Sequence, residues 1–249
     1  MKSYLAELHI HTVVSPCAGI EMIPPLIVQE ALERGINFIA ITDHNTTANV
    51  RAVQMAARGT DLTVLPGMEL QTKEEVHLLC LFDTLDQAEA WQALVSARMP
   101  PLENNIEFFG EQFVVDAAGD FIRRETQLLL TSANLSLKEA VAEVTKLNGL
   151  AIPAHVNRQA FSLIANLGFV PPDVPFAALE ISRHISPTEA QQKFPQLKNY
   201  PLIQNGDVHY LDDFLGVNCF QLAAPTTAEL KLAFLNEQGR SLTINRAKT

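Results

Sequence analysis

The sequence predicts an α/β fold, because short apolar runs rich in Val, Ile, Leu and Phe alternate with longer stretches that have helical spacing. Of the 249 residues, 47% are hydrophobic and 18% are charged, so the chain can bury a core of ordinary globular size. One domain over residues 1–249 is the simplest prediction, since α/β barrels of this length routinely form a single domain.

Seven apolar runs are the best strand candidates. They cover residues 5–11, 37–42, 62–65, 76–82, 150–154, 177–182 and 202–205, and two weaker runs follow at 217–222 and 242–244. Helices are expected at 24–34 and 46–58, each with a glycine directly after its end. A third helix is expected at 136–147, where Ser136 and Glu139 have capping-box spacing. The order of these segments is typical of repeated strand–helix units.

The interval between the fourth and fifth strand runs is much longer than the others. Within it, residues 98–131 begin with Pro100-Pro101 and contain a turn signal at 117–120. We therefore expect an insertion over one face of the domain, with a hairpin around this turn.

Charge and cysteine content exclude some classes of protein. The net charge of −10 argues against a protein whose main partner is long nucleic acid, although small anionic substrates stay compatible. An odd count of cysteines at wide spacing fits a reducing compartment; they are Cys17, Cys80 and Cys219. No apolar run reaches the about 18 residues of a membrane span, and the first residues lack a signal-peptide pattern. We expect a cytoplasmic protein without a membrane partner, and the oligomeric state is not indicated.

Six of the seven histidines lie at or beside predicted strands. In a barrel of parallel strands, the carboxyl ends open on one face, where catalytic groups from distant segments meet. His77 fits less well, because it lies near the start of its run. The five that follow strand ends are His9, His11, His44, His155 and His209.

Their neighbours favour a metal site. His9 and His11 lie two apart on one strand, so their imidazoles share a face and suit Zn, Mn or Fe. Asp207 precedes His209 with the same spacing, and Glu69 lies in an apolar stretch where an unpaired carboxylate is costly. Each feature alone has an ordinary structural explanation, but together with Asp43, which precedes His44, they predict a multinuclear metal site. His184 has no motif partner and is expected on the surface.

The motifs resemble the PHP (polymerase and histidinol phosphatase) family. The matching pieces are Leu8-His9-Ile10-His11-Thr12, Ile41-Thr42-Asp43-His44-Asn45, Gly67-Met68-Glu69, His77, Ala154-His155 and Asp207-Val208-His209. The resemblance implies a distorted (β/α)7 TIM-like barrel in which the 98–131 insertion follows the fourth strand. It also implies two or three divalent ions and a phosphoric ester hydrolase.

Carried over by position, the resemblance implies three ion sites. His9, His11, Glu69 and Asp207 would hold one ion, and Glu69 would bridge to a second held by His77 and His155. His44 and His209 would hold the third. The family's further ligand to that ion is absent here, where the chain reads Ser15-Pro16-Cys17. Cys17 is then a thiolate ligand that favours Zn or Fe, or it is an inert buried thiol beside a weak third site. Cys80 and Cys219 are expected in the core.

The implied chemistry is hydrolysis by a metal-activated hydroxide. Asp207, His209 and Asp43 are the candidate catalytic residues, with Asp43 expected to orient a ligand imidazole. Arg158 and Arg183 follow strand ends and could clamp a substrate phosphate, although each could equally form a surface salt bridge.

The expected substrate is a small phosphorylated molecule, such as a nucleotide, a sugar phosphate or histidinol phosphate. Two alternatives remain. One is an amidohydrolase-type metal hydrolase, whose pattern lacks the Asp43-His44 pair and His209. The other is a non-catalytic metal-binding regulatory module.

Overall fold

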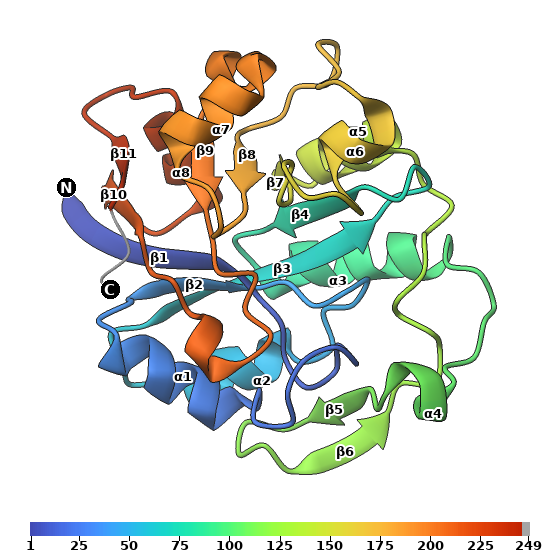
Figure 1. The fold of residues 1–249 in the computed structure, drawn as a ribbon. Coiled ribbons are helices and arrows are strands. Elements are labelled where there is room, and N and C mark those ends of the chain that lie inside the picture. The colour runs from blue at the N-terminus through green and yellow to red at the C-terminus, as the bar shows by residue number, and fades with distance from the viewer. Residues whose placement is uncertain (246–249) are drawn as a thin grey trace.

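The computed structural model describes residues 1–245 and places a strongly curled sheet at the centre of the molecule (Figure 1). Its seven strands have the order β11-β10-β1-β2-β3-β4-β7. They are β1 (Lys2–Ile10), β2 (Phe38–Ile41), β3 (Thr63–Gln71), β4 (His77–Leu81), β7 (Leu150–Pro153), β10 (Asn218–Leu222) and β11 (Ser241–Ile244). A separate parallel pair consists of β8 (Leu179–Ile181) and β9 (Leu202–Gln204).

The β8–β9 pair completes a distorted barrel. On one side, Val156 N donates to Glu180 O at 2.8 Å, which joins the end of β7 to β8. On the other side, Val208 lies beside the end of β1, with hydrogen bonds from Val208 N to His9 O (3.0 Å) and from His11 N to Val208 O (2.9 Å). The α/β fold and the distorted TIM-like barrel are thereby confirmed.

The barrel is not uniformly parallel, which corrects the expectation of parallel strands. β1–β2 and β2–β3 are parallel, whereas β4 is antiparallel to both β3 and β7. The link from β3 to β4 is a tight turn in which Glu75 has φ 59° and Thr72 N donates to Val76 O at 2.9 Å. A turn this short allows only an antiparallel return. The start of β4, and with it His77, therefore lies beside the ends of β1, β2 and β3.

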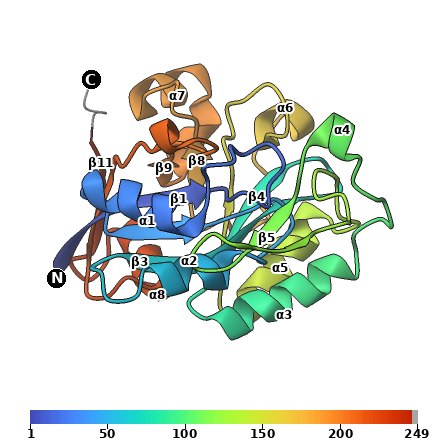
Figure 2. The same ribbon diagram turned by 90° about the horizontal axis from the view of Figure 1, so that it is seen from below.

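Helices surround the sheet on its outer side, as Figure 2 shows for α3 and α5 beneath it. They are α1 (Pro24–Glu33), α2 (Val50–Ala56), α3 (Leu85–Ser96), α5 (Leu137–Lys146), α6 (Leu163–Leu167), α7 (Pro187–Lys193) and α8 (Thr227–Phe234). Two 3₁₀ turns cover Pro195–Asn199 and Leu211–Asp213. At the start of α5, Ser136 and Glu139 form the predicted capping box. Among residues 1–245, no helix combines the length and apolar character needed to cross a bilayer.

The helix expected at 46–58 begins later, at Val50. The residues before it bind other segments through their polar groups. Asn49 Nδ2 donates to Thr12 Oγ1 at 2.9 Å, and Asn49 Oδ1 accepts from Val115 N at 3.0 Å. Thr47 N donates to Gln92 Oε1 at 2.6 Å. These tertiary contacts replace the first helical turn.

The segment between α3 and α5 contains the short helix α4 (Ile106–Phe109) and a hairpin of β5 (Phe113–Val115) and β6 (Phe121–Arg124). The hairpin lies at the turn expected from 117–120, where Gly119 has φ 87°. It packs on the loop after β1 through a hydrogen bond from Phe113 N to Val13 O at 3.2 Å. The description of 98–131 as an insertion in one domain of residues 1–249 stays a prediction.

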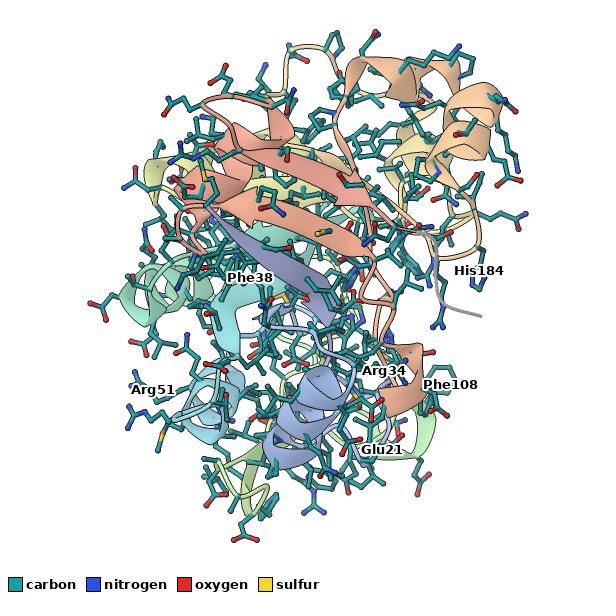
Figure 3. All side chains as sticks on the ribbon, turned by 90° about the vertical axis from the view of Figure 1, so that its left-hand side faces the viewer. Glu21, Arg34, Phe38, Arg51, Phe108 and His184 are labelled. Atoms are coloured by element: carbon teal, nitrogen blue, oxygen red, sulfur yellow. The ribbon has the colours of Figure 1, made fainter. Side chains whose placement is uncertain are left out.

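Apolar side chains fill the barrel and the space under the helices. Leu8, Phe38, Leu79 and Ile152 belong to one fully buried cluster inside the sheet. Cys80 lies in the core as expected, but Cys219 is only half-buried, because alternate residues of β10 face outward. His184 lies on the surface, as predicted (Figure 3).

Candidate metal centre

Eight side chains gather at the end of the barrel where β1, β2 and β3 finish and β4 begins. Seven of them are buried, and His209 is 21% exposed. We call these residues the cluster: His9, His11, His44, Glu69, His77, His155, Asp207 and His209. They include every metal ligand expected from the sequence except Cys17, which is treated separately below.

At the base of the cluster, Asp207 and Glu69 both approach the Nε2 atoms of His9 and His11. His9 Nε2 lies 3.2 Å from His11 Nε2 and 3.2 Å from Asp207 Oδ1, and His11 Nε2 lies 3.3 Å from Asp207 Oδ1. Glu69 approaches the same nitrogens, with Oε1 3.2 Å from His9 Nε2 and Oε2 3.5 Å from His11 Nε2. A tetrahedron with bonds of about 2.0–2.1 Å has edges of about 3.3–3.4 Å. His9, His11 and Asp207 therefore have the spacing of three ligands of a tetrahedral metal site, and Glu69 places one oxygen next to each imidazole nitrogen.

Glu69 also reaches the remaining histidines. Its Oε1 lies 2.9 Å from His77 Nδ1 and 3.2 Å from His155 Nε2. Its Oε2 lies 2.9 Å from His44 Nδ1. The Glu69 carboxylate thus lies close to the nitrogens of His9 and His11, to those of His77 and His155, and to that of His44. A ligand that bridges metal ions needs neighbours of this kind.

The potential ligand atoms also group around His44. His44 lies with Glu69 and His77 in one set, and with His11 and His209 in another, each within 4.8 Å. The expected set for the third ion contains only His44, His209 and Cys17. The structure therefore adds His11 to the side chains near His44 and His209, and His44 belongs to both sets.

Unpaired buried atoms show that these residues fit metal ions. Within residues 1–245, seven buried side-chain nitrogen or oxygen atoms lack a hydrogen-bond partner. Five of them belong to the cluster: His44 Nδ1, Glu69 Oε2, His77 Nε2, His155 Nδ1 and Asp207 Oδ1. His44 Nδ1 and Glu69 Oε2 are 2.9 Å apart yet lack hydrogen-bond geometry. A buried polar atom without a partner is costly, and a cation among these atoms removes that cost.

Hydrogen bonds at Nδ1 hold three imidazoles with Nε2 free. His9 Nδ1 lies 3.0 and 3.1 Å from the two carboxylate oxygens of Glu180, and His209 Nδ1 donates to Asp207 O at 2.9 Å. His11 Nδ1 lies 3.2 Å from Ser15 Oγ. A proton on Nδ1 leaves a lone pair on Nε2, so these contacts fix the tautomer that binds metal.

Asp43 is linked to the cluster by hydrogen bonds through Ser15. Ser15 Oγ donates to Asp43 Oδ1 at 2.7 Å and accepts from His44 N at 3.2 Å. Its other lone pair is then available to the Nδ1–H of His11. Asp43 also accepts from Thr12 N at 2.6 Å and Thr12 Oγ1 at 2.8 Å. Asp43 is therefore connected to the His11 imidazole through the Ser15 hydroxyl. Its role in orienting that imidazole stays a prediction.

The backbone is strained at two cluster residues. His155 has φ 30° and Asp207 has φ 52°, a left-handed conformation that residues with a Cβ adopt at a cost. His155 N donates to Glu180 Oε1 at 3.0 Å, and Val208 N bonds to β1, so tertiary contacts hold both residues. Strain of this kind concentrates at functional sites.

Opposite charges dominate the ionisation of His9 and Glu69. Burial by itself would lower the pKa of His9, but Glu180, Asp207 and Glu69 outweigh it and raise that pKa well above its usual value. Burial also opposes ionisation of Glu69, yet the charges of His77, His9 and His44 hold its pKa well below the usual range.

Cys17 adjoins the third group of ligands. Burial would raise the pKa of its thiol, but the charge of His44 and hydrogen bonds from His209 and His44 lower it to about 6. The thiol is therefore near enough to His44 and His209, the histidines that the resemblance assigns to the third site, for both to lower its pKa. Whether it binds metal stays a prediction.

The two expected phosphate-binding arginines have carboxylate partners. Arg158 Nη1 lies 2.6 Å from Asp207 Oδ2, and its side chain is 43% exposed, so it lies at the open side of the cluster. Arg183 Nη1 lies 2.6 Å from Asp213 Oδ1. Asp213 in turn accepts from the backbone N of His209 at 3.2 Å. Arg158 thus contacts the cluster directly, whereas Arg183 reaches it only through Asp213.

Sequence reasoning missed two residues that contact the cluster. Glu180 is fully buried and bonds both His9 and His155 N, and Asn205 Nδ2 donates to its Oε2 at 2.9 Å. A carboxylate inside the apolar run 177–182 is the same signal that identified Glu69. Ser15 gave no such signal, because an isolated serine is common in loops.

Comparison with known proteins agrees with this geometry. Residues 7–130 match the PHP domain family. The 5'-3' exoribonuclease Rnm of Salmonella typhimurium is 35% identical over 80 residues, which are 30% of this chain and 26% of that protein. This chain therefore shares only about a quarter of the length of that relative.

Two solved structures share the fold. The lesion-specific endonuclease PfuEndoQ from Pyrococcus furiosus has a TM-score of 0.72 at 20% identity, over 97% of this chain and 58% of that one. An amidohydrolase from Chromobacterium violaceum has a TM-score of 0.57 at 17% identity, over 85% and 90% of the two chains. The family match spans the cluster from His9 to His77, and the barrel extends through the rest of the described residues. The chain belongs to the PHP domain family.

Proposed function

We propose that this chain is a metal-dependent phosphoesterase that hydrolyses a phosphate ester of a small molecule. The observation that carries the proposal is that carboxylate oxygens of Glu69 and Asp207 lie 3.2–3.5 Å from the Nε2 atoms of His9 and His11, which are themselves 3.2 Å apart. The PHP family match supports it, and so do the five unpaired atoms of the cluster.

The cluster would hold two or three divalent ions, of which Zn, Mn and Fe suit its imidazole and carboxylate ligands. When bound, such ions acidify a water molecule and offset the negative charge of the phosphate. The protein's own groups position the reaction. Arg158 has guanidinium N–H groups beyond the one directed at Asp207, and these can bind a phosphate oxygen. His209 is the most exposed member of the cluster, and its Nε2 can transfer a proton when only two ions are bound and the third site is empty.

The size of the substrate is the finer part of the proposal. The net charge of −10 disfavours long nucleic acid. The names of Rnm and PfuEndoQ nevertheless indicate that those proteins act on nucleic acids. A nucleotide satisfies both considerations, so nucleotides belong in the first panel together with sugar phosphates, histidinol phosphate and a short single-stranded oligonucleotide.

The test combines metal analysis with product release. Protein purified anaerobically should contain two or three equivalents of Zn, Mn or Fe and should release phosphate or nucleotide from a member of that panel. Asp207→Ala should lose bound metal and activity together. Asp212→Ala is the matched control, because the Asp212 side chain is fully exposed nearby.

Other outcomes contradict the proposal. Turnover of amides or lactones without turnover of any phosphate ester would indicate an amidohydrolase-type enzyme. Stable metal binding without turnover on either panel would indicate a regulatory module.

A further inference from the structure

The loop between β7 and α6 covers part of the cluster and carries three different chemical groups. It begins with His155 and continues to Arg158, which bonds Asp207. It ends at Phe161, directly before Ser162, the residue that caps α6. An imidazole, a cation and an aromatic ring thus come from a single short segment.

Phe161 stacks on a member of the cluster. Its ring centroid lies 5.0 Å from that of His77, with an angle of 18° between the rings. His77 covers one face of the Phe161 ring, yet the residue as a whole is 43% exposed. An apolar ring is therefore presented to solvent beside the cluster.

The backbone holds this ring in place at a cost. Phe161 has φ 52°, a conformation that is unfavourable for a bulky residue. A hydrogen bond from His77 N to Phe161 O, of 3.1 Å, keeps it there. Ser162 Oγ adds a second restraint by donating to Arg158 O at 2.7 Å. Packing in the core accounts neither for the unfavourable backbone conformation of Phe161 nor for its exposure, because its ring is not part of the buried core.

We propose that Phe161 is a stacking platform for a planar ring in the substrate, of the size and polarity of a nucleobase. Aromatic side chains bind bases face to face without regard to sequence, which suits an exposed ring. Arg158 lies at the open side of the same cluster, where a phosphate attached to that base would be bound. This inference rests on the proposed phosphoesterase function and names its substrate class: nucleotides or a terminal nucleotide.

Two substrates that differ only in the base provide the test. AMP and ribose 5-phosphate carry the same 5' phosphate ester, but only AMP has a ring to stack. We expect the wild-type protein to have a lower KM for AMP. Phe161→Leu should raise the KM for AMP by about 10-fold, in line with the usual contribution of one stacked base, and should leave ribose 5-phosphate unchanged. Phe161→Trp should restore the preference.

Phe169→Leu is the matched control, because Phe169 is 54% exposed beyond the far end of α6. It should alter neither substrate. An equal loss on both substrates in Phe161→Leu would overturn the proposal and would show that Phe161 only shields His77. Unchanged kinetics for AMP would overturn it as well.

Affinities for AMP and ribose 5-phosphate, measured by isothermal titration calorimetry, test this inference separately from the proposed function. If the metal-loaded protein hydrolyses no phosphate ester of the panel, AMP and ribose 5-phosphate included, the phosphoesterase proposal fails. Tighter binding of AMP than of ribose 5-phosphate, lost in Phe161→Leu, would still support the platform. Equal binding of the two compounds would overturn it.

Discussion

Glu180 holds His9 by both of its carboxylate oxygens, at 3.0 and 3.1 Å from Nδ1. The same carboxylate accepts from His155 N at 3.0 Å and from Asn205 Nδ2 at 2.9 Å. One buried acid therefore sets the tautomer of one imidazole and the backbone position of another. Carboxylates that hold metal-binding histidines in this way raise the basicity of the free nitrogen.

Glu180→Gln should weaken metal binding by about 10–100-fold, because an amide provides one acceptor instead of two and adds a donor next to His9 Nδ1. Competitive titration with a chromophoric chelator measures the change. Glu237→Gln is the control, since Glu237 is exposed. Unchanged affinity in Glu180→Gln would show that Glu180 is only a structural acid.

Ser15→Ala should remove the acceptor for His11 Nδ1 and the donor to Asp43 Oδ1. Leaving buried groups unpaired costs about 1–3 kcal/mol, so the free energy of unfolding should fall by that amount in urea denaturation. Metal affinity should fall too, because the tautomer of His11 is released. Ser3→Ala, at an exposed position of β1, should change neither quantity. A loss of stability without a loss of metal affinity would argue against the orienting role.

Cys17→Ser should lose one of the bound ions if the thiol completes the third site beside His44 and His209. Metal analysis gives the stoichiometry, and substitution with Co²⁺ should give a thiolate charge-transfer band in the wild-type protein alone. Cys219→Ser is the control, because Cys219 lies half-buried on β10. An unchanged metal count and no such band would identify Cys17 as an inert thiol.

Removing metal with a chelator should lower the Tm, because five buried atoms of the cluster then lack partners. Binding at 100 times the dissociation constant stabilises a native state by about 2.7 kcal/mol per site, so added Zn²⁺ or Mn²⁺ should raise the Tm again. Differential scanning calorimetry measures both changes. The Asp207→Ala protein should respond less. An equal response in that variant would mean that the ions bind elsewhere.

The sequence identified the residues that gather in the cluster because the signals were local. His9 and His11 alternate along one strand, Asp207 and His209 share that spacing, and Glu69 stands out in an apolar run. In the structure, carboxylate oxygens of Glu69 and Asp207 lie 3.2–3.5 Å from the Nε2 atoms of His9 and His11. Local patterns of this kind depend on strand geometry and burial, which single segments already encode.

The direction of β4 and the partners of each imidazole were decided only by the tertiary structure. His77 looked misplaced at the start of its strand until the antiparallel return of β4 brought it to Glu69. Glu180 reaches His9 from a distant segment, and Arg158 and Arg183 proved to be paired with Asp207 and Asp213.

The amino-acid sequence by itself therefore determined the fold class and which residue types could bind metal. Strand direction, tautomers and ion pairs depend on contacts between segments far apart in the chain, and no local pattern specifies such contacts. The exposed ring of Phe161 belongs to this second group, because its function depends on His77, which β4 places beneath it.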